Sequence, residues 1–146
     1  MKWLLFSLFI FSSPAFAQGD TPFGRPADPK KAQRTVRVEM NDQMRYSPAE
    51  IVVKRGERIR FEVVNKGKVE HELVLGTMTG LKQHLEHMKL HAGAAHQGSH
   101  QSNEVEVAPG KSGVLGWQFT KAGEFYYGCL VPGHFEAGMI GKLVVQ

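Results

Sequence analysis

The sequence contains a single cysteine, Cys129, among its 146 residues. Small exported domains usually carry cysteines in even numbers as disulfide staples, so a lone cysteine excludes a framework of internal disulfides. Three roles remain for such a thiol: an intermolecular bridge, a reactive group or a metal ligand. Cys129 therefore requires an explanation of its own.

Long hydrophobic runs are also lacking beyond the first residues. The chain starts MKWLLFSLFIFSSPAFAQ, with one positive charge, an apolar run from Trp3 to Phe11, and small residues at Ala15 and Ala17. This pattern predicts a signal peptide over residues 1–17 that is cleaved after Ala17, because the run is too short to span a bilayer as a permanent helix. A buried N-terminal helix or an uncleaved anchor is the alternative. We therefore expect an exported protein with no stable membrane insertion after cleavage.

A strong excess of either charge sign is lacking as well. The formal net charge is +4, from 18 Lys and Arg against 14 Asp and Glu, and it falls to +3 when Lys2 leaves with the signal peptide. The basic residues are scattered and do not form a stripe with interleaved aromatics, so we expect no nucleic-acid partner. The 129 residues after Ala17 suffice for one domain with a sizeable core, but not for two.

Alternating apolar residues predict a β-protein from Thr35 onward. Residues 18–34 carry three prolines, two glycines and too little apolar surface to fold on, so we expect a flexible arm there. Beyond the arm, the period-two pattern of half-buried strands occurs at 36–40, 51–53, 59–63, 69–75, 115–119, 125–129 and 142–145. Seven or so short strands separated by turns predict an all-β fold, an antiparallel Greek-key β-sandwich or barrel over residues 35–146.

An insertion at residues 78–103 interrupts the strand pattern. Residues 79–90, TGLKQHLEHMKL, lack alternation and contain helix-forming residues, and residues 91–103 are polar. On a helix, three apolar side chains share one stripe: Leu81, Leu85 and Met88. Three histidines lie within about 60° of one another on the adjoining stripe: His84, His87 and His91. We expect a short, histidine-rich helix inserted between two strands.

The stretch around Cys129 contains donors that suit a soft metal ion. In YGCLVPGHFEAGM, His134 follows Cys129 by five residues and Met139 follows His134 by five more. Two His, one Cys and a long axial Met make the trigonal type 1 copper site. This hypothesis needs a second histidine, and His71 is the candidate because its strand parity points the ring among apolar side chains. An unpartnered imidazole would be costly there.

The same stretches resemble a known family. They are His71 in VEHELVLG, the aromatic approach FYYGC, Pro132-Gly-His134, Gly138-Met139 and the final strand GKLVV. Over nearly all of residues 35–146 the chain resembles the cupredoxins, the small blue-copper family of plastocyanin, pseudoazurin, azurin and rusticyanin. The resemblance implies a cupredoxin-like fold and one type 1 copper ion, with His71, Cys129, His134 and Met139 as ligands. With its insertion, the chain is most similar to periplasmic copper-tolerance cupredoxins of proteobacteria, which implies a periplasmic location.

Two features depart from the usual family pattern. Glu72 stands where the family has an Asn whose side chain ties the two ligand loops together. The gap between Cys129 and His134 is longer than in plastocyanin and closer to that of rusticyanin. Because groups next to the ligands tune a metal site, we expect Glu72 to affect the reduction potential.

Every candidate residue also has an explanation that involves no metal. Cys129 could be a small buried hydrophobe, His134 a loop histidine, His71 a satisfied core histidine and Met139 a core side chain. The insertion is compositional evidence, and its histidines could equally be a solvated, polar helix face and tail. If the insertion binds a second copper ion, the candidate ligands are His84, His87, Met88, His91, His96 and His100.

These observations leave three functional hypotheses. The first is a periplasmic type 1 copper protein that carries single electrons to a redox partner the sequence does not identify. The second is copper tolerance, by binding copper or oxidising cuprous ions, with the insertion as the acquisition surface. The third is a cysteine-dependent hydrolase or thiol peroxidase that uses Cys129 with His134 as base. We expect no enzyme, because four protein ligands leave no open position for substrate and Cys129 lies at a strand end.

Overall fold

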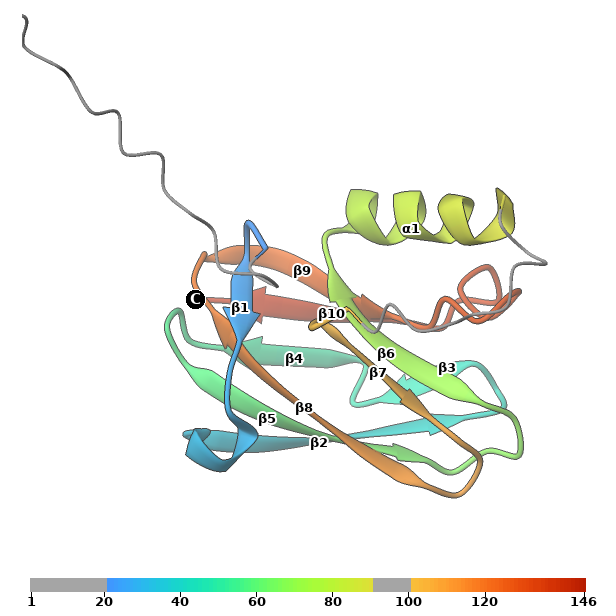
Figure 1. Cartoon of the computed structure of the whole chain (residues 1–146), viewed down its shortest axis with the longest axis horizontal. Helices are drawn as coiled ribbons and strands as arrows, with labels where there is room; N and C mark the ends of the chain where they lie inside the picture. The colour runs from blue at the N-terminus through green and yellow to red at the C-terminus, as the bar shows by residue number, and fades with distance from the viewer. Residues whose placement is uncertain (1–20, 91–100) are drawn as a thin grey trace, which may run out of the picture.

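The computed structural model describes residues 21–90 and 101–146, which form a two-layer β-sandwich with one helix on its outer side (Figure 1). One five-stranded sheet has the order β1-β8-β5-β2-β3 and the other has the order β4-β10-β9-β6-β7. The strands are β1 (Gly24–Pro26), β2 (Arg34–Asn41), β3 (Arg45–Ser47), β4 (Glu50–Val53), β5 (Arg58–Asn65), β6 (His71–Gly76), β7 (Glu104–Val107), β8 (Ser112–Phe119), β9 (Gly123–Gly128) and β10 (Ile140–Val145). The all-β prediction is therefore confirmed.

All seven strands expected from alternation are present, and three further strands were missed. β1, β3 and β7 contain only three or four residues each, too few for alternation to stand out from the surrounding turns. The expectation of purely antiparallel sheets is wrong, because β2 pairs with β5 in parallel and β4 pairs with β10 in parallel. Period-two alternation reports only that one face of a strand is buried, and it does not report the direction of the neighbouring strand.

The expectation of a flexible arm is wrong for residues 21–34. β1 pairs with the end of β8, and Phe23 is buried, with its ring 5.2 Å from that of Phe125. The prolines fit this structure: Pro26 ends an edge strand, and Pro29 starts the 3-10 helix η1 (Pro29–Lys31), where its missing N–H is not needed. The expected signal peptide and residues 18–20 lie outside the described residues.

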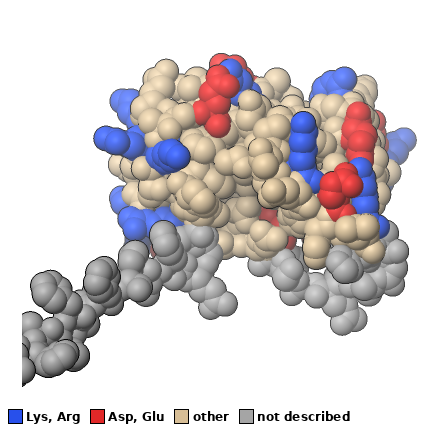
Figure 2. Space-filling model, turned by 90° about the horizontal axis from the view of Figure 1, so that it is seen from above, with Lys and Arg blue, Asp and Glu red and all other residues tan. Residues whose placement is uncertain are grey.

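The main core fills the space between the two sheets. Its fully buried side chains come from both layers and include Phe61, Trp117 and Phe119 of one sheet and Leu73, Tyr127 and Leu143 of the other. On the face shown in Figure 2, the charged side chains form separate groups with a wide uncharged area between them. Among the described residues, no helix combines the length and the apolar character needed to cross a bilayer.

The expected helix is present as α1 (Met78–Leu90), which lies on the outer side of the sheet that contains β6 and β9 (Figure 1). Leu81 and Leu85 are buried and Met88 is partly buried, as the apolar stripe predicts. The two leucines form a second, smaller core with Val74 of β6, Leu130 and Phe135. Both faces of β6 are therefore covered, one by the main core and the other by α1.

Candidate metal centre

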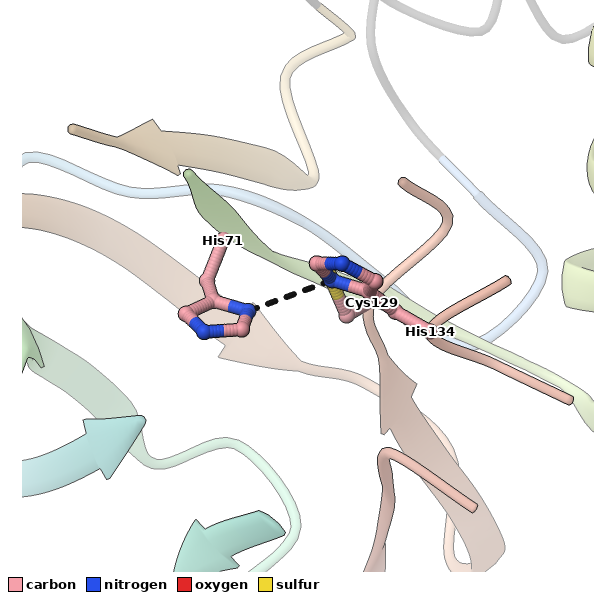
Figure 3. A group of neighbouring side chains, drawn as sticks. All are labelled: His71, Cys129 and His134. Carbon is pink, nitrogen blue, oxygen red and sulfur yellow. Dashed lines mark hydrogen bonds between the residues drawn. The ribbon is translucent and has the colours of Figure 1, made fainter. Parts of the chain in front are cut away.

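Three candidate ligand residues converge at one end of the sandwich (Figure 3). His71 is the first residue of β6, Cys129 directly follows β9, and His134 lies in the loop that leads to β10. β6 and β9 are antiparallel neighbours, so the start of one lies beside the end of the other. The pairing thus brings together two segments that lie far apart in the sequence.

The donor atoms of these residues lie close enough to share one ion. Cys129 Sγ is 3.3 Å from His134 Nδ1, and His134 Nδ1 is 3.2 Å from His71 Nδ1. All three donor atoms lie within 4.8 Å of one another, and the described residues contain no other such group of His, Cys, Asp or Glu. Two imidazole nitrogens this close need a proton or a cation between them. An N₂S donor set of this kind fits copper of the type 1 class.

Burial shifts the pKa of two of these donors, Cys129 and His134. His71 and Cys129 are fully buried, whereas His134 is partly exposed. Burial raises the pKa of the Cys129 thiol to about 12, although the Glu72 backbone N–H, 3.5 Å from Sγ, acts in the opposite direction. Burial also lowers the pKa of His134, as does the neighbouring His71. Reactive cysteines have a lowered pKa, so this environment disfavours Cys129 as a free nucleophile and leaves the thiol to be deprotonated by a metal.

The loop between β9 and β10 holds Met139 beside the other candidates. The Cys129 backbone N–H donates to the Met139 carbonyl at 3.2 Å, and the Met139 N–H donates to the His134 carbonyl at 3.0 Å. Gly138 has a φ of 90°, a left-handed conformation that favours glycine, which lets the chain turn immediately before Met139. The Met139 side chain is fully buried in the main core. All four predicted ligand residues therefore lie in one compact region.

Two long side chains fasten this loop from outside. Arg45 of β3 donates from Nη1 to the Ala137 carbonyl at 3.0 Å. Lys89 of α1 forms an ion pair with Glu136 at 2.9 Å and another with Glu86 at 2.9 Å. Each contact is exposed and contributes little stability alone, but together they connect the loop to both of its neighbours.

Glu72 supplies the tie that the family resemblance assigns to an Asn. Its carboxylate Oε1 accepts a hydrogen bond from the Leu130 backbone N–H at 2.6 Å, and its carbonyl accepts one from the Tyr46 hydroxyl at 2.6 Å. Burial raises the pKa of this carboxyl to about 7. The side chain following His71 is thus bonded to the residue following Cys129, and the two ligand segments are connected by a carboxyl group.

The described part of the insertion does not form a comparable cluster. His84 is partly buried and His87 is exposed on α1, and Met88 packs against the second core. No group of three His, Cys, Asp or Glu donors includes either histidine within residues 21–90 and 101–146. His91, His96 and His100 lie outside the described residues.

Sequence reasoning missed Asp42, which contacts the ring of His71. Asp42 lies between β2 and β3, and its Oδ1 is 3.1 Å from His71 Nε2. The two residues are 29 positions apart, and aspartate is common in turns for local reasons. Nothing in a single sequence therefore distinguishes Asp42 from an ordinary turn residue.

A sandwich of two mixed sheets with a convergent His–Cys–His group at one end defines a protein of the cupredoxin class. Residues 32–146 match the family model described as copper binding proteins, plastocyanin/azurin family, and the chain belongs to this family. The expected family and fold class are thus confirmed.

Named relatives and solved structures agree with this assignment. The chain is 55% identical over 127 residues to the copper-resistant cuproprotein CopI of Rubrivivax gelatinosus, covering 87% of this chain and 75% of that protein. It is 36% identical over 170 residues to the CopI of Pseudomonas aeruginosa, covering 98% and 91%. Among solved structures, auracyanin B aligns with a TM-score of 0.69 at 21% identity, covering 89% of this chain and 99% of that chain. Auracyanin A of Chloroflexus aurantiacus, a "blue" copper protein, aligns with a TM-score of 0.62 at 26% identity, covering 77% and 98%.

Proposed function

We propose that this chain is an exported type 1 copper protein in which His71, Cys129, His134 and Met139 hold one copper ion. The observation that carries the proposal is the convergence of two imidazole nitrogens and one thiol within 4.8 Å in a member of the plastocyanin/azurin family. The burial of Met139 and its backbone bonds to Cys129 and His134 support it as the fourth, weak axial ligand. Copper bound in such a site supplies a one-electron redox couple.

The protein's contribution is to hold the donors in place and to exclude water. His71 and Cys129 are fixed by neighbouring strands, and the loop turns between Cys129 and Met139 fix the other two ligands. With four protein ligands no position remains for a substrate, so the site suits binding and electron transfer, not catalysis on a bound molecule. His134 is the one partly exposed member of the buried group, and its ring is the route by which an electron reaches a partner protein.

The biological role that we propose is copper tolerance in the periplasm. Two relatives are named copper-resistant cuproproteins, and the N-terminal pattern predicts export with cleavage after Ala17. Electron carriage and oxidation of cuprous ions would use the same ligands as copper binding. The test is to delete the gene and compare growth on copper with respiration in the absence of copper stress. Copper sensitivity with normal respiration supports tolerance, and the opposite pattern supports an electron shuttle.

Replacing Met139 with Leu is expected to leave copper bound and to raise the reduction potential. The thioether is a weak donor, and it stabilises Cu(II) more than the apolar leucine side chain does. The axial ligand therefore tunes the reduction potential of such sites. Voltammetry of the copper-loaded protein measures the change. Met40→Leu is the matched control, because Met40 is equally buried in the same core and is not a proposed ligand. An identical potential in Met139→Leu and wild type would show that Met139 only packs.

We also propose that the insertion binds copper separately from the type 1 centre. Imidazoles suit Cu(II) and the thioether of Met88 suits Cu(I), so a variant with all five insertion histidines changed to Ala should bind fewer ions per chain than wild type. The five are His84, His87, His91, His96 and His100. Imidazole must be unprotonated to bind a metal, so the additional binding should weaken as the pH is lowered.

Copper titrations with ion counting test this prediction, and a Lys82→Ala/Gln83→Ala variant of the same helix controls for changes to its exposed face. The histidine variant should retain the visible copper band, which shows that the type 1 centre is intact. If wild type and variant each bind one ion and protect cells equally, the insertion is a solvated surface.

A further inference from the structure

The ring of His71 has two nitrogens with different partners. Nδ1 faces His134, as Figure 3 shows, and Nε2 lies 3.1 Å from Asp42 Oδ1. The ring itself is fully buried, whereas the Asp42 side chain is 38% exposed. A buried candidate ligand therefore contacts a carboxylate at the surface on the side opposite the metal donors.

The Asp42 carboxylate is held in place by the loop between β5 and β6. Oδ2 accepts a hydrogen bond from the Lys68 backbone N–H at 2.7 Å. A Cβ added at Gly67 would clash with Oδ1 of Asp42, so glycine at this position lets the carboxylate approach the loop. The loop is in turn fixed by buried Asn65, whose side chain accepts from the Gly67 N–H and donates to the Val107 carbonyl. These contacts hold the Asp42 carboxylate against the loop between β5 and β6, and so keep it next to His71.

We propose that Asp42 is a positioning residue that fixes His71 in the tautomer with its proton on Nε2 and its lone pair on Nδ1. An ionised carboxylate can only accept hydrogen bonds, so the ring must present a proton to Asp42. The Asp42 side chain is 38% exposed, and a carboxyl group in contact with water is ionised at neutral pH. Nδ1, the atom that faces Cys129 and His134, is then the free donor.

This proposal rests on the proposed copper site and extends it to the reduction potential. A carboxylate bonded to the far nitrogen of a ligating histidine orients the ring and raises its basicity. The more basic donor and the added negative charge favour Cu(II) over Cu(I). Asp42 is therefore expected to strengthen Cu(II) binding and to lower the reduction potential of the centre.

The test is Asp42→Asn, which keeps the size of the side chain and removes its charge. Lys68 and His71 contact different oxygens of Asp42, and Asn keeps only one of these two acceptors. An amide NH₂ turned toward the ring can only donate, so it favours the other tautomer of His71. In the copper-free protein, ¹⁵N NMR of the His71 ring should show the proton moving from Nε2 toward Nδ1. In the copper-loaded protein, Cu(II) affinity should fall by about tenfold. If Cu(I) affinity is unchanged, this corresponds to a rise in potential of about 59 mV.

Gly67→Ala tests the same contact without changing any charge, because its Cβ displaces the carboxylate. It should shift the ring tautomer and the potential in the same direction as Asp42→Asn, and the double variant should show less than the sum of the two effects. Asp28→Asn is the matched control. Asp28 also accepts a hydrogen bond from a backbone N–H, that of Lys30, at the start of η1. It lies away from the copper site, because Arg58, which begins β5, donates to the Lys31 carbonyl of η1, whereas the loop that holds Asp42 follows the other end of β5.

The positioning role and the copper site can fail separately. A wild type that shows no thiolate-to-copper band under full copper loading overturns the proposed function, whatever Asp42 does. A coloured wild type whose Asp42→Asn variant keeps both the wild-type ring shifts and the wild-type potential overturns the positioning role. The same potential change in Asp28→Asn would also overturn it, because the effect would then be one of net charge alone.

Discussion

Changing Cys129 to Ser is expected to abolish the visible charge-transfer band of the protein loaded with Cu(II). The band of a type 1 centre arises from the copper–thiolate bond, and a serine hydroxyl is neither soft nor readily deprotonated. Ser differs from Cys by one atom, and Cys129 is the only cysteine in the chain, so no other thiolate can replace it. Absorption and electron paramagnetic resonance spectra during a copper titration measure the effect.

His71→Ala tests the same site through the ligand that β6 supplies. It removes one of three strong donors and should reduce Cu(II) affinity far more than Met139→Leu, which removes only the weak axial donor. Circular dichroism of each copper-free variant controls for folding. A band that survives Cys129→Ser, or a colourless wild type under full copper loading, would contradict the type 1 assignment.

The environment of Cys129 also bears on the hypothesis of a cysteine hydrolase or peroxidase. A nucleophilic cysteine needs a lowered pKa and access to substrate, whereas Cys129 is fully buried and burial raises its pKa to about 12. His134 lies 3.3 Å from Sγ, which a catalytic pair would also show, so the distance alone does not separate the two hypotheses. The burial and the raised pKa of the Cys129 thiol do separate them, and they favour a metal ligand over a nucleophile.

The sequence was informative where local spacing determines geometry. Cys129, His134 and Met139 belong to one short loop whose backbone turns are closed by hydrogen bonds between residues of the loop itself, and strand parity correctly pointed His71 inward. The helix was likewise predictable, because the apolar stripe of Leu81 and Leu85 has a helical period. These features need no knowledge of which strands are neighbours.

The sequence was uninformative where partners lie far apart along the chain. The parallel pairing of β2 with β5 depends on the packing of two layers, and alternation is the same for both directions. Phe23 is buried only because Trp117 and Phe125 lie beside it, so a segment with few apolar residues was wrongly expected to be an arm. The contact of Asp42 with the His71 ring and the hydrogen bond from the Leu130 N–H to Glu72 likewise exist only in the folded protein.

Helix α1, the described helical part of the insertion, packs directly on the candidate metal loop. Leu81 is 2% exposed and forms the second core with Leu130 and Phe135. Both of these residues belong to the loop: Leu130 directly follows Cys129, and Phe135 directly follows His134. The Leu81 side chain also lies against the backbone of two glycines: a Cβ added at Gly76 would be 3.0 Å from Leu81 and one at Gly128 would be 3.4 Å from it. Gly128 immediately precedes Cys129.

Leu81→Ala is therefore expected to destabilise the protein by about 2–5 kcal/mol, the usual cost of truncating a buried leucine. Little rearrangement can fill the space, because the neighbouring glycines have no side chains and belong to paired strands. Such a loss is a large fraction of the roughly 5–15 kcal/mol that typically stabilises a domain. Urea unfolding of the copper-free protein, followed by tryptophan fluorescence and circular dichroism, measures the free energy of unfolding.

Leu90→Ala provides a matched control for this prediction, because it makes the same substitution in the same helix at a side chain that is 82% exposed. It should change the free energy of unfolding by no more than about 0.5 kcal/mol. A large loss for Leu81→Ala and none for Leu90→Ala would mean that α1 stabilises the loop of Cys129, His134 and Met139. Equal, small effects of the two substitutions would instead mean that the helix is attached to the domain without supporting it, and copper binding at the loop should then be insensitive to both.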